Sequence, residues 1–503
     1  MRARPVIAIL LASVASWAAF ELTSLPGPGL DPDAMSYLGA AQSLAAGHGL
    51  RIPAAPWHTA ASTAPLAHFP PGYPLVIAVG IRAGFTPVES ARVIMALAAA
   101  VTAVGTLIAL WSAWSAVGGV MAVLLLLVTP AMTVVHASVL SEPLFLALMA
   151  LFLCAMMRAK RDAVRSWAMG TLAAAAIMVR YAGAALVLAA VLDAWLSDEP
   201  VKARVRRLLS VAALPVLAMA VWTLSRARDP ATESIRTSAL YVAHWDRTIT
   251  EGVTTARIWL APGVESLPLA TALALTAVAV LVALTVRSAR ATRTTEAQRR
   301  GGGLIRATAL VGWSYVGVLL ASRLFADGEI PLDERLLAPL GLTMTIGASQ
   351  MITEWIRGGH AWRSVFVTAL AIGWMLGASV PTRVWLEEYR GDGGDLASTR
   401  WRMSGLVHYA RTHADTLYSN EMSALWFHSA RAVHELPLRP DAATIAAFRA
   451  KLARENGALL AWEFGDTENA AVDAIVKGAG LAAVLHDSSG TVWKVPVVSQ
   501  ARP

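Results

Sequence analysis

The chain is built from apolar runs of roughly 15 to 20 residues that are separated by short polar loops. A helix needs about 20 apolar residues to cross the hydrocarbon core of a bilayer, because each residue advances it by about 1.5 Å. Hydrophobic residues make up 56% of the chain and charged residues 15%, which excludes a set of soluble domains. The sequence therefore predicts an α-helical polytopic membrane protein with about eleven transmembrane helices.

The basic residues between these runs predict the topology. Loops rich in Lys and Arg stay in the cytoplasm, and residues 158–165 contain four basic residues while 287–306 contain six arginines. Together with the basic MRAR start, these loops predict that the N-terminus is cytoplasmic. The short run 74–84 is then a helix at the outer interface, because counting it as a span would put the basic residues 158–165 outside. The net charge of +8 thus indicates a multi-pass protein of the cytoplasmic (inner) membrane, with no nucleic-acid partner. The expected spans are 5–25, 91–111, 117–135, 143–157, 166–179, 182–196, 208–224, 269–286, 308–321, 336–352 and 365–380.

Two domains are expected. Residues 1–380 form the membrane domain, whose first external loop is 25–90, and residues 225–267 form a second long external loop. In residues 381–503 the apolar runs shorten to strand length and alternate with helical patterns. This alternation predicts a small extracytoplasmic α/β domain.

Two acids on the outer side are the candidate catalytic groups. Asp33 begins a short helix after the first span, where Asp31 can cap the helix and Asp33 meets the positive end of its dipole. Glu142 opens a span on the same face of the membrane. Both acids can be plain helix N-terminal residues. Alternatively, they divide base and orienting roles or together bind a divalent cation such as Mg²⁺ or Mn²⁺.

Two arginines are the cationic complement of these acids. Arg180 interrupts an apolar stretch, which is costly unless a partner such as a lipid phosphate offsets its charge. The simpler alternative is an arginine that snorkels from a helix end. For Arg335 the simpler alternative is a local ion pair, since Asp333 and Glu334 precede it. His68 is a further candidate, although a single histidine at an interface is more often structural.

Six short motifs occur in a fixed order along residues 1–390. They are Asp33 followed by Tyr37, GHG at 47–49, PPGYP at 70–74, SEPLF at 141–145, RYAG at 180–183 and D-x-R-L-L-x-P at 333–339. In these motifs the chain resembles the GT-C superfamily of polyprenyl-phosphate-dependent glycosyltransferases. The resemblance is to the branch of protein O-mannosyltransferases and lipid A aminoarabinose transferases.

The resemblance implies an inverting glycosyltransferase. It would move a hexosyl or pentosyl group from a polyprenyl-phosphate donor to a lipid, glycan or protein acceptor on the outer face. Asp33 would deprotonate the acceptor, and Glu142 would orient it or help to bind a metal. Arg180 and Arg335 would stabilise the leaving phosphate. Tyr37 and Tyr73 of these motifs are candidate substrate contacts, and so is His68, which with Phe69 stands where the aminoarabinose branch often has a lysine.

Two other classes of protein have a similar composition. A transporter or lipid flippase would carry charges at mid-membrane and paired repeats, and the sequence shows neither. A non-enzymatic envelope-assembly protein would use the C-terminal domain for docking. Such a protein would tolerate the loss of Asp33, which separates it from an enzyme.

Overall fold

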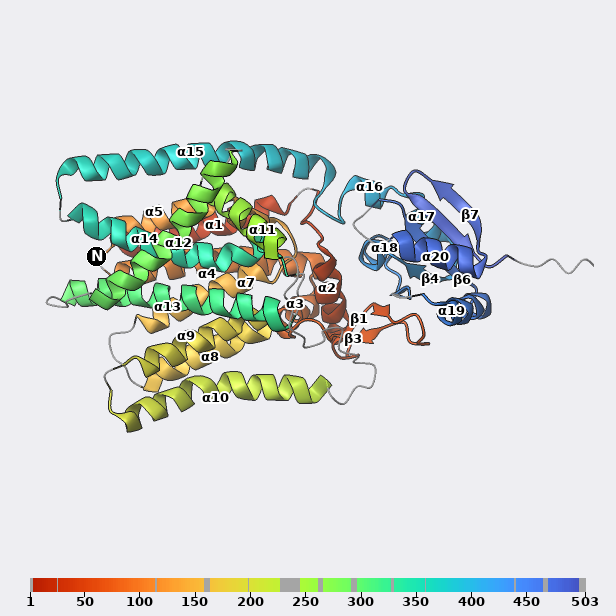
Figure 1. Ribbon diagram of the computed structural model, residues 1–503, viewed down its shortest axis with the longest axis horizontal. Helices are drawn as coiled ribbons and strands as arrows, with labels where there is room; N and C mark the ends of the chain where they lie inside the picture. Colours follow the sequence, from red (N-terminus) through yellow and green to blue (C-terminus); the bar gives the residue numbers. More distant parts are fainter. Residues whose placement is uncertain are drawn as a thin grey trace, which may run out of the picture.

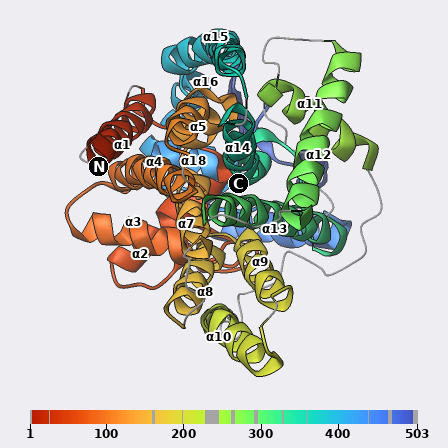
Figure 2. The ribbon, with the colours of Figure 1, turned by 90° about the vertical axis from the view of Figure 1, so that its left-hand side faces the viewer.

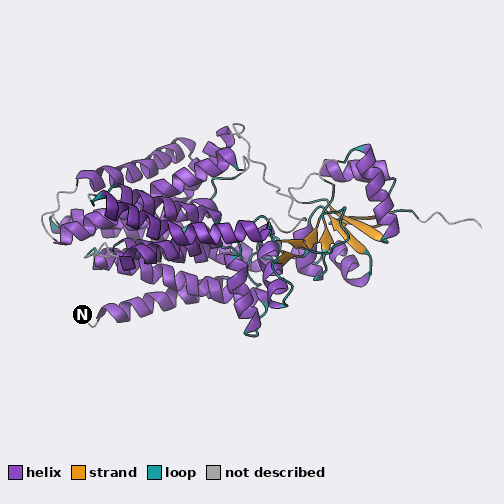
Figure 3. Ribbon diagram, turned by 90° about the horizontal axis from the view of Figure 1, so that it is seen from below, coloured by secondary structure: helices purple, strands orange, loops and turns teal. Residues whose placement is uncertain are grey.

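The computed structural model shows an elongated helical bundle with a smaller α/β domain at one end (Figure 1). Viewed from below, the strands gather at that end, beyond the helices (Figure 3). The structure describes residues 3–24, 26–113, 115–157, 163–197, 199–226, 245–260, 266–290, 296–326, 330–357, 359–437, 440–464 and 469–496.

The bundle is formed by the first fifteen helices of the described chain. Those of its first part are α1 (Ala3–Leu22), α2 (Pro32–Ala45), α3 (Gly72–Arg82), α4 (Pro87–Ser112), α5 (Ala116–Val128), α6 (Pro130–Ala137), α7 (Glu142–Met156), α8 (Ala163–Val179), the 3₁₀ turn η1 (Tyr181–Gly183), α9 (Ala184–Trp195) and α10 (Val201–Arg226). Those of its second part are α11 (Trp245–Leu260), α12 (Leu267–Arg290), α13 (Glu296–Phe325), α14 (Glu334–Arg357) and α15 (Ala361–Asp392).

Several of these helices are long and apolar enough to cross a membrane. Among the described residues six qualify, in α1, α4, α10, α13, α14 and α15, and the bent pair α5 and α6 makes a seventh. The apolar helices α3, α7, α8 and η1–α9 are shorter than that length. The fold class is therefore as predicted, while the count of about eleven spans stays a prediction.

Two segments differ from the sequence-based expectation. Residues 117–135 were expected to form one straight span, but the chain bends by 60° between α5 and α6. Pro130 causes the break, because proline lacks the N–H of a helical hydrogen bond and its ring clashes with the preceding turn. The expected loop 225–267 contains α11, while its residues 227–244 and 261–265 lie outside the described residues, as do 158–162 and 291–295 of the basic loops.

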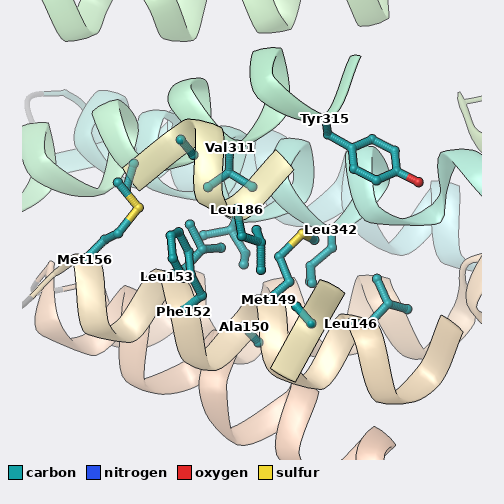
Figure 4. Close-up of a cluster of buried hydrophobic side chains, with 14 of the residues drawn as sticks. Leu146, Met149, Ala150, Phe152, Leu153, Met156, Leu186, Val311, Tyr315 and Leu342 are labelled. Carbon is teal, nitrogen blue, oxygen red and sulfur yellow. The ribbon is translucent and has the colours of Figure 1, made fainter. Parts of the chain in front are cut away.

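The bundle core is apolar and closely packed. In the end-on view, α7 and α13 lie at the centre, with α1, α10 and α15 on the outside (Figure 2). Met149, Phe152 and Leu153 of α7 are fully buried against side chains of α9, α13 and α14 (Figure 4). Gly105 of α4 lets α7 approach closely, since a Cβ there would lie 2.8 Å from the Cβ of Ala150. Such small-residue contacts are typical of helices packed within a membrane.

A buried charge cluster fixes the end of the bundle opposite Arg180. Asp193 of α9 is 3% exposed. Its carboxylate accepts hydrogen bonds from Arg165 of α8, at 3.0 Å, and from Arg207 of α10. Arg306 of α13 lies 3.4 Å from the other carboxylate oxygen. One buried carboxylate therefore links four helices, an arrangement that requires several partners to offset its desolvation.

The α/β domain follows α15, and the predicted boundary at 380–381 falls within this helix. Its helices are α16 (Thr399–Arg402), α17 (Gly405–Thr412), α18 (Met422–Ser429), α19 (Ala442–Arg454) and α20 (Asn469–Ala479). The strands of the chain are β1 (Arg51–Ile52), β2 (Ala54–Ala55), β3 (Ala64–Pro65), β4 (Thr416–Ser419), β5 (Val433–His434), β6 (Gly457–Trp462), β7 (Ala482–Asp487) and β8 (Gly490–Lys494).

The main sheet combines strands from both domains. Its order is β2-β5-β4-β6-β8-β7. Strands β2, β5, β4 and β6 are parallel to one another, and β8 is antiparallel to its neighbours β6 and β7. Because β2 lies in the loop between α2 and α3, the α/β domain is joined to that loop by backbone hydrogen bonds. β1 and β3 form a separate antiparallel pair within the loop.

Candidate active site

The site begins at the N-terminus of α2. Asp31 is the N-cap, as predicted, and its carboxylate accepts a hydrogen bond from the backbone N–H of Asp33 at 3.1 Å. Pro32 occupies the first helical position, where a missing N–H costs nothing. This local geometry holds Asp31 and Asp33 side by side at the end of the bundle that faces the α/β domain (Figure 1).

Arg335, in the first turn of α14, joins these two acids. Its Nη1 donates to Asp31 Oδ2 at 2.9 Å, and its Nη2 donates to Asp33 Oδ2 at 2.8 Å. The predicted local alternative does not hold, because Asp333 instead accepts from the backbone N–H of Leu336 at 2.8 Å and so caps α14. A guanidinium can serve two carboxylates at once because its donors form a fixed planar fork.

Glu142, in the first turn of α7, connects Arg335 with Arg180. The Glu142 side chain is 1% exposed, and its Oε1 lies 2.9 Å from Arg335 Nε and 2.7 Å from Arg180 Nη1. Neither contact has hydrogen-bond geometry, and Oε2 accepts no hydrogen bond from the residues that the structure describes. Burying a carboxylate is costly without such charges beside it, so the two arginines offset the desolvation of Glu142.

Arg180 points into the protein from the junction between α8 and η1. Its side chain is 12% exposed, and its Nη1 donates to Ser141 Oγ at 3.0 Å. Ser141 Oγ also shares a hydrogen bond of 3.2 Å with the hydroxyl of Tyr37. The snorkelling alternative is therefore wrong, because the guanidinium turns inward to Glu142 and Ser141.

The three predicted substrate contacts lie beside this polar cluster. Tyr37 packs edge-on against Tyr73 with ring centroids 5.1 Å apart, and its ring lies 4.9 Å from Phe69. His68 contacts the outer side of Phe69 at 4.6 Å and is partly buried. Tyr37 and Tyr73 are fully buried, so they form a wall of the cluster, while His68 lies one ring farther out.

Two members of the cluster were missed as site residues. Asp31 was predicted as a helix cap, but it also pairs with Arg335. Ser141 was not singled out, although it links Tyr37 with Arg180. Nothing in the sequence marks Ser141, since one serine before a helix is common. For Asp31 there was a signal, because it lies only two residues before Asp33 and could share its partners.

The acids were also tested for metal binding. Among the residues that the structure describes, no group of three His, Cys, Asp or Glu side chains is placed to hold a metal ion. Asp33 and Glu142 both face Arg335. As arranged, the two carboxylates do not fit a metal centre, because a cation would have to displace the guanidinium from both; the metal assignment stays a prediction.

The environment shifts the proton affinity of Asp33. Burial raises the pKa of its carboxyl to about 6, with Arg335 acting in the opposite direction. Asp31 and Glu142 raise this pKa further, and Arg180 lowers it. A carboxyl group that titrates near neutral pH is well suited to take a proton from a hydroxyl group.

An apolar cavity of about 390 Å³ lies along α14. Its walls come from α5, α6, α11, α12, α14 and α15, and they include Met132, Trp259, Gly341, Met344 and Trp374. Gly341 is less than two turns from Arg335 along α14. Asp33, Glu142, Arg180 and Arg335 are not among the residues that line this cavity.

No sequence-family model and no curated protein sequence matches this chain. Its fold does match solved structures. ArnT from Cupriavidus metallidurans bound to undecaprenyl phosphate aligns with a TM-score of 0.56 and 14% identity, over 100% of this chain and 99% of that chain.

Two other solved structures align over nearly the whole chain. The oligosaccharyltransferase AglB from Archaeoglobus fulgidus, with an inhibitory peptide and a dolichol-phosphate, gives a TM-score of 0.56 and 10% identity over 94% of this chain and 71% of that one. The arabinofuranosyltransferase AftD from mycobacteria gives a TM-score of 0.52 and 15% identity over 97% of this chain and 40% of that one. At these identities the likeness shows the fold alone, and the chain shares the membrane-protein fold of these three structures.

Proposed function

We propose that this protein is an inverting membrane glycosyltransferase that moves a sugar from a polyprenyl-phosphate donor to an acceptor on the outer membrane face. One observation carries the proposal. Two acids and two arginines from four separate helical segments meet at one end of an apolar bundle, in which an apolar cavity lies along α14. A lipid-linked anion needs this combination of cationic and apolar surfaces.

The reaction assigns one role to each group. Asp33 takes the proton of the acceptor hydroxyl, whose oxygen then attacks the anomeric carbon of the sugar. The bond from that carbon to the phosphate oxygen breaks, and its electron pair stays on the departing phosphate. Arg180 and Arg335 stabilise the charge that develops there. Attack from the side opposite the phosphate inverts the anomeric configuration.

The ion pairs suggest how donor binding prepares the base. Arg335 is shared by Asp31, Asp33 and Glu142 before any phosphate arrives. A donor phosphate that takes over part of this guanidinium releases Asp33 from an ion pair. Losing a cationic neighbour raises the pKa of a carboxyl group, so Asp33 becomes a stronger base when the donor is bound.

The function is tested by a donor panel. Membranes that contain the wild-type protein are supplied with radiolabelled polyprenyl-phosphate hexoses and pentoses, and label is followed into lipid, glycan and protein fractions. Transfer from at least one donor, absent with Asp33→Asn, supports the proposal and identifies the acceptor class. An absence of transfer from every donor, with the wild-type protein folded in the membrane, contradicts it.

The plot of kcat/KM against pH is expected to have its acid limb near pH 6. Asp33 has a raised pKa, so it is a carboxylate above about pH 6 and is protonated below it. A protonated Asp33 cannot accept the hydroxyl proton, and kcat/KM should fall tenfold for each pH unit below that value. Initial rates between about pH 4.5 and 8 measure this limb. A limb near 4, the ordinary pKa of an aspartate, would contradict the raised pKa of Asp33.

For orientation, we propose that the N-terminus lies in the cytoplasm and the α/β domain outside the inner membrane. Single cysteines test this in a Cys154→Ala background, at the exposed positions Ser62, Met403 and Lys202. An impermeant thiol reagent should label the first two in intact spheroplasts, and Lys202→Cys only after permeabilisation. Labelling of Lys202→Cys from outside would place the charged cluster on the cytoplasmic face.

A further inference from the structure

Three distant segments of the chain meet directly beside Asp31. Gly29 N donates to Ala137 O at 2.9 Å, and Val139 N donates to Gly29 O at 2.9 Å. On the other side, Leu30 N donates to Gly394 O at 3.4 Å and Leu396 N to Leu30 O at 3.0 Å. Residues 29–30 thus form the middle of a parallel three-segment junction between 137–139 and 394–396.

Two side-chain hydrogen bonds connect residues 389–395 to this junction. Tyr389, in the last turn of α15, is 5% exposed, and its hydroxyl donates to Ala137 O at 2.6 Å. Ser138 Oγ donates to Asp395 Oδ2 at 3.3 Å. Gly29 permits the close approach, because a Cβ there would overlap both Ser138 Oγ and the Tyr389 hydroxyl.

The junction sets the positions of both acids. Asp31 follows Leu30 directly and caps the helix that carries Asp33, while Glu142 comes three residues after Val139. The spacing between the two acids therefore depends on how residues 29–30 lie against 137–139. The hydroxyl of Tyr389 fixes that contact from outside both segments.

The α/β domain holds the same loop at three other places. β2 pairs with β5, and Ser423 Oγ of α18 donates to Pro32 O at 3.4 Å. Lys451 Nζ donates to Thr59 O at 2.9 Å. Figure 1 shows α15 leading from the bundle into this domain, so Tyr389 lies where the two domains join.

We propose that Tyr389 and the segment 394–396 are a positioning element that makes the extracytoplasmic domain part of the active site by fixing Asp33 against Glu142. The inference rests on the function proposed above. Tyr389 does not touch the polar cluster itself, so it acts through the backbone at residues 29–30 and 137–139.

Tyr389→Phe tests this inference, because it removes the hydroxyl and keeps the ring. We expect kcat to fall by about tenfold or more, since small displacements of catalytic groups slow chemistry strongly. The KM for the donor should stay close to the wild-type value, because Arg180 and Arg335 remain in place. Tyr418→Phe is the matched control, since Tyr418 is also buried and donates to Glu455 at 2.8 Å, away from the junction.

A second measurement does not depend on activity. Amide hydrogen exchange should become at least about threefold faster in peptides that span 28–34 and 137–142 in Tyr389→Phe, and in Ser138→Ala. It should stay unchanged there in Tyr418→Phe. Wild-type kcat and wild-type exchange in Tyr389→Phe would overturn the inference while leaving the proposed function intact. A wild-type protein without transfer activity would instead remove the function on which the inference rests.

Discussion

Asp33→Asn should lower sugar transfer by roughly a thousandfold, the usual contribution of a positioned general base. Asparagine keeps the size of the side chain and accepts the hydrogen bond from Arg335, but it cannot take a proton from the acceptor. The structure supports this role, because Asp33 is partly buried, has a raised pKa and lies opposite Glu142 across a shared arginine. Initial rates with saturating donor, together with the melting temperature, measure the effect.

Asp31→Asn provides the matched control for Asp33→Asn. Asp31 also pairs with Arg335, at 2.9 Å, and asparagine preserves its helix cap. Because Asp31 is a partner of the arginine and not the base, its replacement should cost far less activity. Equal losses in the two variants, or nearly full activity in Asp33→Asn, would end the assignment of Asp33 as the base.

Arg335→Ala should abolish transfer and also destabilise the protein by roughly 3 kcal/mol, because removing one partner leaves a buried charge uncompensated. Arg335 is within 2.9 Å of an oxygen atom of each of Asp31, Asp33 and Glu142. Without it, Asp31 and Asp33 lose this ion pair, and Glu142 keeps only its contact with Arg180 among the described ion pairs. The melting temperature and the initial rate of sugar transfer measure the two effects separately.

Arg335→Lys separates charge from geometry. A lysine ammonium is a point charge that cannot replace a planar fork, so it should restore part of the stability but little of the rate. Arg92→Ala is the control, since Arg92 of α4 donates to Thr23 Oγ1 at 3.1 Å and to Phe20 O at 3.3 Å, with no acid of the cluster. Full activity in Arg335→Lys, or equal losses in Arg92→Ala, would contradict the role of Arg335.

Features that depend only on residues close together in the sequence were predictable. The apolar runs marked most of the long helices, because membrane helices must be apolar along their whole length. The Asp31 cap was also predictable, since it depends on residues two positions apart. The four strand-length apolar runs of the C-terminal part, 416–420, 458–464, 481–486 and 491–495, correspond to β4, β6, β7 and β8.

Features that depend on distant contacts were not predictable. Arg335 and Asp33 are 302 residues apart, and the local sequence suggested a pair with Asp333 or Glu334 instead. β2 contains two alanines, and its pairing with β5 is set by the docked α/β domain and not by local propensity. The bend at Pro130 is different, because proline is itself a local signal of a helix break, and the prediction of one span followed the apolar run alone.

The most direct test of the central claim uses proteoliposomes. Purified protein is reconstituted with a radiolabelled polyprenyl-phosphate sugar and an acceptor extract. Three quantities are measured: the polyprenyl phosphate released, the sugar transferred to the acceptor, and the donor that moves between the two leaflets. We predict that polyprenyl phosphate and glycosylated product appear in equal amounts, that the product is inverted at the anomeric carbon, and that Asp33→Asn forms neither. Donor that crosses the bilayer with its sugar-phosphate bond intact, at the same rate in wild type and Asp33→Asn, would contradict glycosyl transfer.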